Sequence, residues 1–326
     1  LPEQSMSYES GKQSGRHGVD GKTIAEMLVN RAAATPTEPA FMSKRGGTWQ
    51  TTTWQQAIER SLEIAHGLVA LGMKPDDKVA IIGSTREEWS LSDFGLLLAG
   101  GVTVPIYPSS LKEACTFILR DSESSWVFVE NEKQLGKLTA ERDKLPGLKK
   151  VIVWDDAPES EWTISLSELL VMGRAHRTKE PTALQEIRAQ RTGDSLATII
   201  YTSGTTGNPK GVVVANDAFT IGTRYGVAAL PVKQSDVQVL FLPLAHSFAK
   251  MLEIVAVRAG FCTAFAESID KLVDNLAEVK PTFMAGVPRI YEKVYSGFLA
   301  KAKAGGPVKW KLVSWALDVG LQASKE

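Results

Sequence analysis

The feature that most constrains the fold is a repeated alternation of short apolar runs with longer segments of helical spacing. The runs are rich in β-branched and aromatic residues, and the segments between them include 88–99 and 111–119. Strands that are joined by helical crossovers form mostly parallel sheets. We therefore expect an α/β protein with two doubly wound, mostly parallel sheets and helices on both faces. The expected strands are Lys78–Ile82, Thr103–Tyr107, Trp126–Val129, Val151–Trp154, Leu196–Tyr201, Val237–Leu242 and Cys262–Phe265.

Composition along the chain predicts three parts. Residues 1–22 are polar and rich in Gly and Ser, without the apolar core of a signal peptide, and predict a mobile leader. Residues 23–185 are expected to form a first α/β subdomain, and residues 186–326 a second, partial one. The stretch 155–194 has no strong strand signal and is expected to cross between the two.

One helix has well-marked ends. Thr53 is a suitable N-cap, and Gln56 three residues later completes a capping box. Gly72 can adopt the left-handed conformation that ends a helix. These residues predict a helix from about 53 to 71.

Charge and apolar-run length exclude several classes of protein. Lys plus Arg and Asp plus Glu number 37 each, so no net basic field exists to concentrate nucleic acid. The charge-free apolar stretch 94–107 is interrupted by glycines and Pro105 and is too short to span a bilayer. Cys115 and Cys262 lie far apart, which indicates neither a disulfide framework nor a zinc site. A cytoplasmic protein is expected, with peripheral contact at the inner membrane face left open.

The most informative segment for function follows the apolar run that ends at Ile200. Two glycines allow close approach of the backbone to a ligand, and four hydroxyls add to the exposed amides. Lys210 contributes a positive charge at the end of the loop. Dense donors of this kind suit phosphate oxygens, although a flexible polar surface turn has the same composition. The segment fits neither the Walker pattern, because Gly211 follows Lys210, nor the dinucleotide G-x-G-x-x-G pattern.

The sequence YTSGTTGNPKGV at 201–212 resembles the signature loop of the adenylate-forming superfamily, which contains acyl-CoA synthetases, luciferases and the adenylation domains of peptide synthetases. The resemblance extends from about residue 23 to the end of the chain. Segments that resemble the same family in the same order are 71–80, 88–89, 99–108 and 242–246. Residues 242–248 and 281–294 look most like long-chain fatty acyl-CoA synthetases.

The resemblance implies a two-step reaction. A carboxylate attacks the α-phosphate of ATP and releases pyrophosphate, and the thiol of coenzyme A then takes the acyl group from the adenylate. Lys210 is the implied catalytic cation for the leaving pyrophosphate, and the Thr202 hydroxyl would lie near Mg²⁺. The implied nucleotide-binding residues are Thr202, Ser203, Gly204, Thr205, Thr206, Gly207 and Lys210.

His246 is the second candidate catalytic residue. A lone histidine beside apolar residues is commonly a packed structural side chain. The resemblance instead implies that the histidine ending 242–246 lies beside the carboxylate-binding site and positions the substrate. Some fatty acyl-CoA synthetases have an aromatic gate four residues further on, but Lys250 occupies that position, so an identical gate is not expected. Residues 287–293 are interpreted as a turn that enters a solvated helix, with a wall of the acyl site as the alternative.

The resemblance stops before the family's chemistry is complete. The family continues with a Thr-Glu motif that holds the metal, an aspartate for the ribose and a domain with a catalytic lysine, and none is found before Glu326. We expect an N-terminal portion of a long-chain fatty acid–CoA ligase, with the second sheet incomplete at its C-terminal end. The alternatives are a nucleotide- or acyl-binding module without turnover and an adenylation domain for amino or aryl acids.

Overall fold

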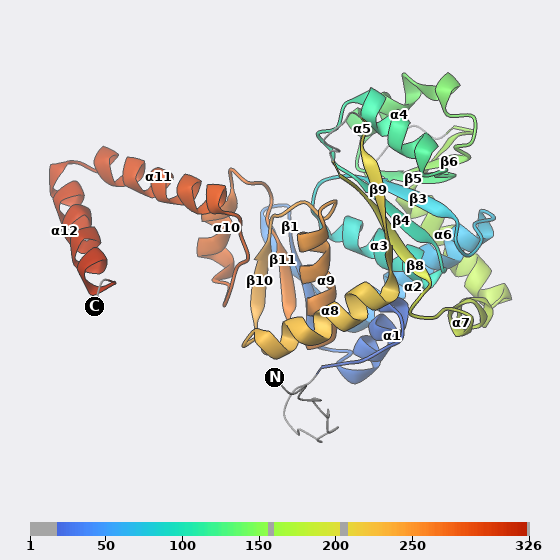
Figure 1. The fold of residues 1–326 in the computed structure, drawn as a ribbon, viewed down its shortest axis with the longest axis horizontal. Helices are drawn as coiled ribbons and strands as arrows, with labels where there is room; N and C mark the ends of the chain where they lie inside the picture. The colour runs from blue at the N-terminus through green and yellow to red at the C-terminus, as the bar shows by residue number, and fades with distance from the viewer. Residues whose placement is uncertain (1–17, 156–159, 203–207, 325–326) are drawn as a thin grey trace, which may run out of the picture.

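The computed structural model describes residues 18–155, 160–202 and 208–324, which form two sheets with helices packed around them (Figure 1). The larger sheet has seven strands in the order β7-β6-β5-β3-β4-β8-β9. All its neighbours are parallel except β8 and β9, which pair antiparallel. Its strands are β3 (Lys78–Ile82), β4 (Val102–Ile106), β5 (Trp126–Val129), β6 (Lys150–Val153), β7 (Thr163–Ser165), β8 (Leu196–Thr202) and β9 (Lys210–Ala215).

Helices cover both faces of this sheet, because alternate residues of its central strand are buried in different cores. Val79 and Ile81 of β3 pack in the core that contains α2, α3 and α6, whereas Ala80 and Ile82 pack with α4 and α5. A strand buried on both faces is a near-continuous apolar run, which explains why β3 is recognisable in the sequence. The helices are α2 (Trp54–Ala70), α3 (Glu87–Leu98), α4 (Lys112–Asp121), α5 (Glu132–Thr139) and α6 (Leu166–Lys179), with a short 3₁₀ helix at Arg142–Lys144.

The smaller sheet has four strands in the order β10-β11-β1-β2. β10 (Val237–Leu240), β11 (Cys262–Phe265) and β1 (Pro39–Arg45) are parallel, and β2 (Thr48–Thr53) forms an antiparallel hairpin with β1. The helices α1 (Ile24–Ala34), α8 (Asn216–Ala229) and α9 (Ser247–Ala259) accompany it. Phe41 of β1 contacts the rings of both Phe94 on α3 and Phe265 on β11, so one apolar core joins the two sheets.

The expected α/β class with two mostly parallel sheets is confirmed, and the seven expected strands are present. Each sheet, however, draws strands from both sides of residue 186: β8 and β9 join the larger sheet, and β1 and β2 join the smaller one. Parallel pairing brings together strands that are distant in sequence, as in the pair Thr103 and Thr198. The stretch 155–194 is more than a crossing, since it contains β7, α6 and α7 (Ala183–Ala189).

Both ends of α2 form as expected. The Thr53 side chain accepts from the Gln56 amide, and the Gln56 side chain accepts from the Thr53 amide. Gly72 follows the helix with φ +93°, in the left-handed region. The capping-box prediction is therefore confirmed.

The end of the expected leader is held against the body. The Val19 amide donates to the Arg258 carbonyl at 2.9 Å, and the Asp20 carboxylate pairs with the Arg258 guanidinium. Burial of the guanidinium beside α8 fixes this contact. Residues 1–17, the rest of the expected leader, lie outside the described residues.

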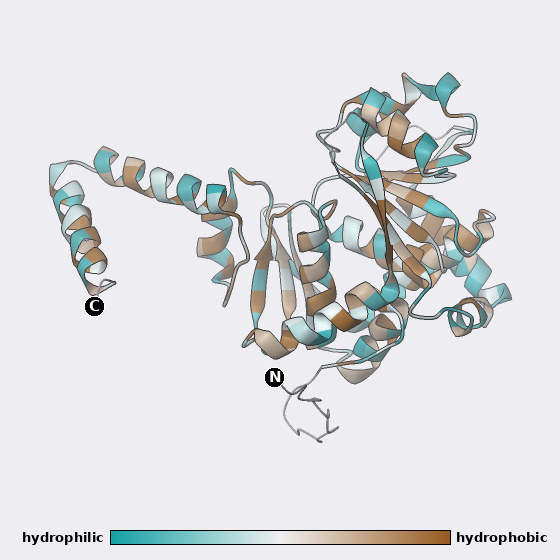
Figure 2. Ribbon diagram, viewed as in Figure 1, coloured by the Kyte–Doolittle hydropathy of each residue, from teal (hydrophilic) through white to brown (hydrophobic). Residues whose placement is uncertain are grey.

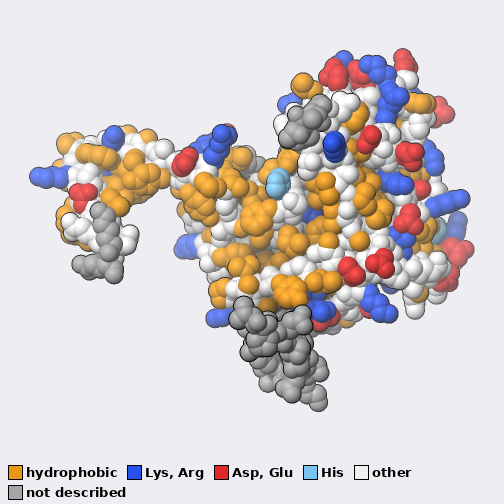
Figure 3. All heavy atoms as spheres, in the orientation of Figure 1, with side chains coloured by type: hydrophobic (Ala, Val, Ile, Leu, Met, Phe, Trp, Pro, Cys, Tyr) orange, Lys and Arg blue, Asp and Glu red, His pale blue; other side chains and the backbone are white. Residues whose placement is uncertain are grey.

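Three helices, α10 (Leu272–Val279), α11 (Pro288–Ala304) and α12 (Pro307–Ala323), extend the chain beyond the smaller sheet, and α11 and α12 project away from the body (Figure 1). Hydrophobic and polar residues alternate along them (Figure 2), and hydrophobic side chains lie at their surface (Figure 3). Pro288 begins α11 and its neighbours are exposed, which supports the interpretation of 287–293 as the entry to a solvated helix. Of the helices that the structure describes, none has the length and apolarity to cross a membrane.

Candidate functional site

The two ends of the candidate phosphate loop are paired strands. Thr202 is the last residue of β8 and Lys210 the first of β9, and the two are partners across the antiparallel ladder. Both are exposed, although β8 is buried over residues 197–200. The hairpin therefore presents a hydroxyl and an ammonium side by side at the mouth of the loop. Ser203, Gly204, Thr205, Thr206 and Gly207, the other predicted phosphate-binding residues, lie outside the described residues.

Close packing at the start of β9 requires glycine. A Cβ on Gly211 would lie 2.8 Å from Ile199 Cγ2 and 3.0 Å from the Tyr201 ring. The Tyr201 hydroxyl donates to Asp121 Oδ2 at 2.6 Å, which ties the end of β8 to the end of α4. Burial, followed by the Asp121 carboxylate, raises the pKa of Tyr201 above its usual value of 10. Tyr201 therefore remains a neutral donor that anchors the strand leading into the loop.

His246 caps the first turn of α9. Its Nδ1 accepts from the Phe248 amide at 3.2 Å, and its own amide donates to the Pro243 carbonyl at 2.9 Å. The side chain is exposed, so the packed structural alternative does not describe it. The ring nitrogen that is not used for capping faces no partner recorded among the described residues and is available to a ligand.

The segment before His246 is attached to the larger sheet by one hydroxyl. Thr85, in the loop after β3, donates to the Leu242 carbonyl at 2.8 Å and accepts from the Leu244 amide at 3.2 Å. The loop after β3 and the segment after β10 therefore meet at the carboxyl ends of their strands. Thr202 also ends a parallel strand of the same sheet. Ligands of open α/β sheets bind in the crevice at this edge.

A cavity of about 350 Å³ opens at this edge between the two sheets. It is lined by Thr85 and Arg86 from the loop after β3, by Lys44 of β1 and by Glu267 after β11. The lining is charged, and Arg86 pairs with Glu88 at 2.6 Å and with Asp155 at 3.0 Å. The positive groups of this cavity are thus already engaged by carboxylates.

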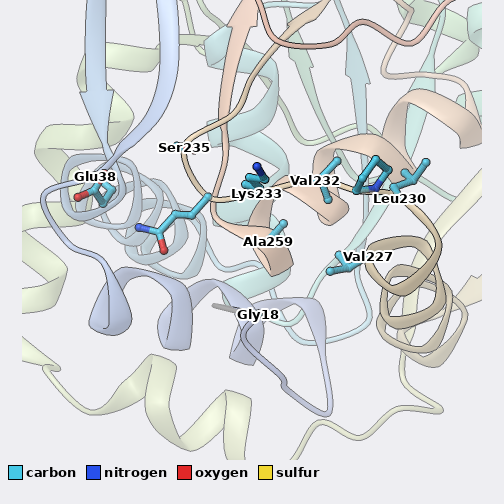
Figure 4. Close-up of a pocket in the computed structure, with 10 residues that line it drawn as sticks. Gly18, Glu38, Val227, Leu230, Val232, Lys233, Ser235 and Ala259 are labelled. Carbon is cyan, nitrogen blue, oxygen red and sulfur yellow. The ribbon is translucent and has the colours of Figure 1, made fainter. Parts of the chain in front are cut away.

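A second cavity, of about 640 Å³, lies at the opposite edge of the smaller sheet (Figure 4). Glu38 precedes β1, Ser235 precedes β10 and Ala259 precedes β11, so the cavity is at the amino ends of these parallel strands. None of the predicted site residues lines it. Its position excludes it as part of the phosphate-loop site.

The described residues supply few ligands for a metal. Within residues 18–155, 160–202 and 208–324, no group of three or more His, Cys, Asp or Glu could hold a metal ion. Mg²⁺ commonly binds substrate phosphates together with only one or two protein groups. The Thr202 hydroxyl beside Lys210 fits a site of that kind, in which the nucleotide supplies most of the oxygen ligands.

Sequence patterns missed two contributors to this site. Thr85 is a single hydroxyl after a buried strand, and nothing local marks it as the anchor of the segment before His246. Lys250, expected only as a departure from an aromatic gate, is fully buried against Asp93 of α3. The local sign that could have indicated a buried contact is the charged pair Lys250 and Glu253, three residues apart among the apolar residues of α9.

Comparison with known proteins agrees with this arrangement. Residues 28–317 match the family model of AMP-binding enzymes. The chain therefore belongs to the AMP-binding enzyme family, and the resemblance to adenylate-forming enzymes is confirmed.

Two similar proteins are named long-chain-fatty-acid–CoA ligases. The chain is 32% identical to the long-chain-fatty-acid–CoA ligase ACSBG2 of Xenopus laevis over 296 residues, which cover 87% of this chain and 40% of that protein. It is also 32% identical to human ACSBG1, another long-chain-fatty-acid–CoA ligase, over 86% of this chain and 40% of that protein. The chain thus spans about two fifths of the length of these relatives.

Solved structures share the fold. The N-terminal domain of FACL13 from Mycobacterium tuberculosis superposes with a TM-score of 0.71 at 26% identity, over 83% of this chain and 64% of that one. A fatty acyl CoA synthetase from the same organism superposes with a TM-score of 0.70 at 26% identity, over 82% of this chain and 50% of that one. The fold described above is therefore shared with the N-terminal domain of FACL13 and with the fatty acyl CoA synthetase.

Proposed function

We propose that the protein activates a long-chain fatty acid with ATP, forms an acyl-adenylate and transfers the acyl group to coenzyme A, with this chain as an N-terminal portion of the ligase. The observation that carries the proposal is the 32% identity to long-chain-fatty-acid–CoA ligases across more than four fifths of the chain. The exposed pair of Thr202 and Lys210 at the mouth of the loop supports it.

The chain's residues have separate tasks in the first step. Lys210 and the hydroxyls of the loop bind the β- and γ-phosphates and neutralise charge on the leaving pyrophosphate. His246 orients the fatty acid carboxylate from the start of α9, so that its oxygen is in line with the α-phosphate. Mg²⁺, when bound with the nucleotide near Thr202, supplies further charge neutralisation at the phosphate oxygens.

The proposed partners are a long-chain fatty acid, ATP and coenzyme A. Nucleic acid is not a proposed partner. The proposed location is the cytoplasm, with peripheral contact at the inner membrane face left open. Balanced charge, with 37 basic and 37 acidic residues, supports a small-molecule role over nucleic-acid binding.

A second candidate function is a nucleotide- or acyl-binding module without turnover. Adenylation of amino or aryl acids is the third candidate.

Pyrophosphate exchange by the complete protein separates the candidates. A panel contains palmitate, shorter fatty acids, amino acids and aryl acids, each with ATP, Mg²⁺ and labelled pyrophosphate. Exchange that depends on palmitate, and that is lost in Lys210→Ala, supports the ligase. Exchange only with amino or aryl acids contradicts the fatty acid assignment, and nucleotide binding without exchange supports the module.

A further inference from the structure

A buried ion pair joins α9 to α3. Lys250, one turn after His246, places its ammonium against the Asp93 carboxylate and 3.2 Å from Glu253 Oε2. The exposed fractions of Lys250 and Asp93 are 3% and 0%. Since a buried ion pair is often no more stabilising than an apolar contact of similar volume, stability alone does not explain these residues.

The hydrogen bonds continue from Asp93 into the larger sheet. Thr103 of β4 donates from Oγ1 to Asp93 Oδ1 at 2.6 Å, and Thr198 of β8 donates from Oγ1 to the Thr103 carbonyl at 2.8 Å. Both threonines are at most 1% exposed. They are also the residues that pair β4 with β8. We call the run Lys250–Asp93–Thr103–Thr198 the buried polar chain.

One end of the buried polar chain adjoins the turn of His246, and the other end is on the strand that leads to Thr202. The Lys250 amide donates to the His246 carbonyl at 3.1 Å, so Lys250 belongs to the turn that His246 caps. Thr198 lies four residues before Thr202 on the same extended strand, about 13 Å along β8. The buried polar chain therefore connects the turn that presents His246 with the strand that presents the phosphate loop.

We propose that the buried polar chain is a positioning device, which holds His246 and the end of β8 at Thr202 at the separation needed for in-line attack. The inference rests on the proposed function, because it assigns the carboxylate to His246 and the phosphates to the loop. A small displacement of one half would leave each binding surface intact but misalign the reacting atoms. Loss of the buried polar chain should therefore lower kcat, with little change in the KM for ATP or for the fatty acid.

The test uses Thr103→Val and Thr198→Val, which keep shape and remove only the hydroxyl. In the complete protein, kcat for palmitate-dependent pyrophosphate exchange should fall about tenfold, with KM for ATP and palmitate within about twofold of wild type. Thr198→Ser, which restores the hydroxyl, should recover most of the rate.

Thr223→Val is the matched control. Thr223 is 0% exposed on α8, donates to the Phe219 carbonyl at 2.7 Å and accepts from Arg258 Nε at 2.9 Å. This substitution therefore removes at least as many buried hydrogen bonds as Thr198→Val, but away from the buried polar chain. Its kcat should stay at the wild-type value. Equal losses of rate in Thr223→Val and Thr198→Val would overturn the proposal and leave the proposed function intact.

Amide hydrogen exchange tests the same link without activity. Thr103→Val should speed exchange at both 196–202 and 246–250, whereas Thr223→Val should affect neither. Faster exchange confined to β4 would overturn the positioning proposal. Failure of the wild-type protein to exchange pyrophosphate with any fatty acid would instead contradict the proposed function, and the amide measurement would still decide whether the two segments are linked.

Discussion

The Nδ1 atoms of His66 on α2 and His176 on α6 are 3.0 Å apart at the contact between the two helices. Burial, followed by the neighbouring His176, Arg177 and Arg188, lowers the pKa of His66 to about 4. Arg177 also pairs with Glu59, and Arg174 pairs with Glu63, across the same contact. The neutral form of His66 is therefore favoured at this contact.

Acid should therefore weaken the α2–α6 contact. The pKa of His66 is about 4 in the folded protein and 6.5 in the unfolded chain, so its contribution to stability is complete above pH 6.5 and lost as the pH falls towards 4. We expect a loss of about 2 kcal/mol over this range. Urea unfolding between pH 4 and 7 measures it, and His66→Gln should flatten the profile. A profile in His66→Gln that matches the wild-type profile would contradict this assignment.

Glu253 should have the opposite pH dependence. Burial raises its pKa to about 7, against the attraction of Lys250. Protonated Glu253 contributes to the stability of the fold below pH 4.5, the pKa of a glutamate in the unfolded chain. This contribution is lost as the pH rises through about 7, its pKa in the folded protein. The unfolding free energy of the wild-type protein should fall by about 1 to 3 kcal/mol between pH 5 and 8. This fall should be absent in Glu253→Gln. Urea unfolding of Glu253→Gln and wild type at four pH values measures this difference. If the two plots of unfolding free energy against pH are parallel, Glu253 does not titrate between pH 5 and 8.

Lys210→Ala should impair adenylation without unfolding the protein. Loss of a positioned donor to a developing charge commonly costs about 3 kcal/mol, or about a hundredfold in rate. The side chain is exposed, so the unfolding midpoint should not move. Pyrophosphate exchange with palmitate measures the effect in the complete protein. Lys233→Ala, at another exposed lysine, is the control, and equal rates for the two variants would remove Lys210 from the phosphate site.

Thr85→Val should loosen the segment that leads into His246. The substitution deletes the hydroxyl that serves both the Leu242 carbonyl and the Leu244 amide, and we expect a destabilisation of about 1 to 2 kcal/mol. The KM for the fatty acid should rise, because the mobile segment presents His246 less often in its binding position. Thr51→Val, on the exposed side of β2, should change neither quantity. A wild-type KM in Thr85→Val would show that this anchor does not serve substrate binding.

Local patterns were sufficient for much of the larger sheet and for one complete helix. The β5 run is apolar over its whole length and the β3 run after Lys78, and both strands have the predicted limits. The capping box at Thr53 acts within three residues, so the sequence around it defines the helix start. By contrast, β2 was missed because its TWQTTT sequence is polar and mostly exposed, and its pairing with β1 is what makes it a strand.

Short-range features can be predicted from the amino-acid sequence: the apolar runs, the helix ends and the Gly- and Thr-rich loop with Lys210 at its end. Which distant residues meet depends on how the elements pack. Thr85 bonds to the backbone of Leu242 and Leu244, and Lys250 meets Asp93, across 157 to 159 positions of the chain. The physical reason is that periodicity and capping act over a few residues, whereas the partner of a buried charge or a strand edge depends on how separate elements pack.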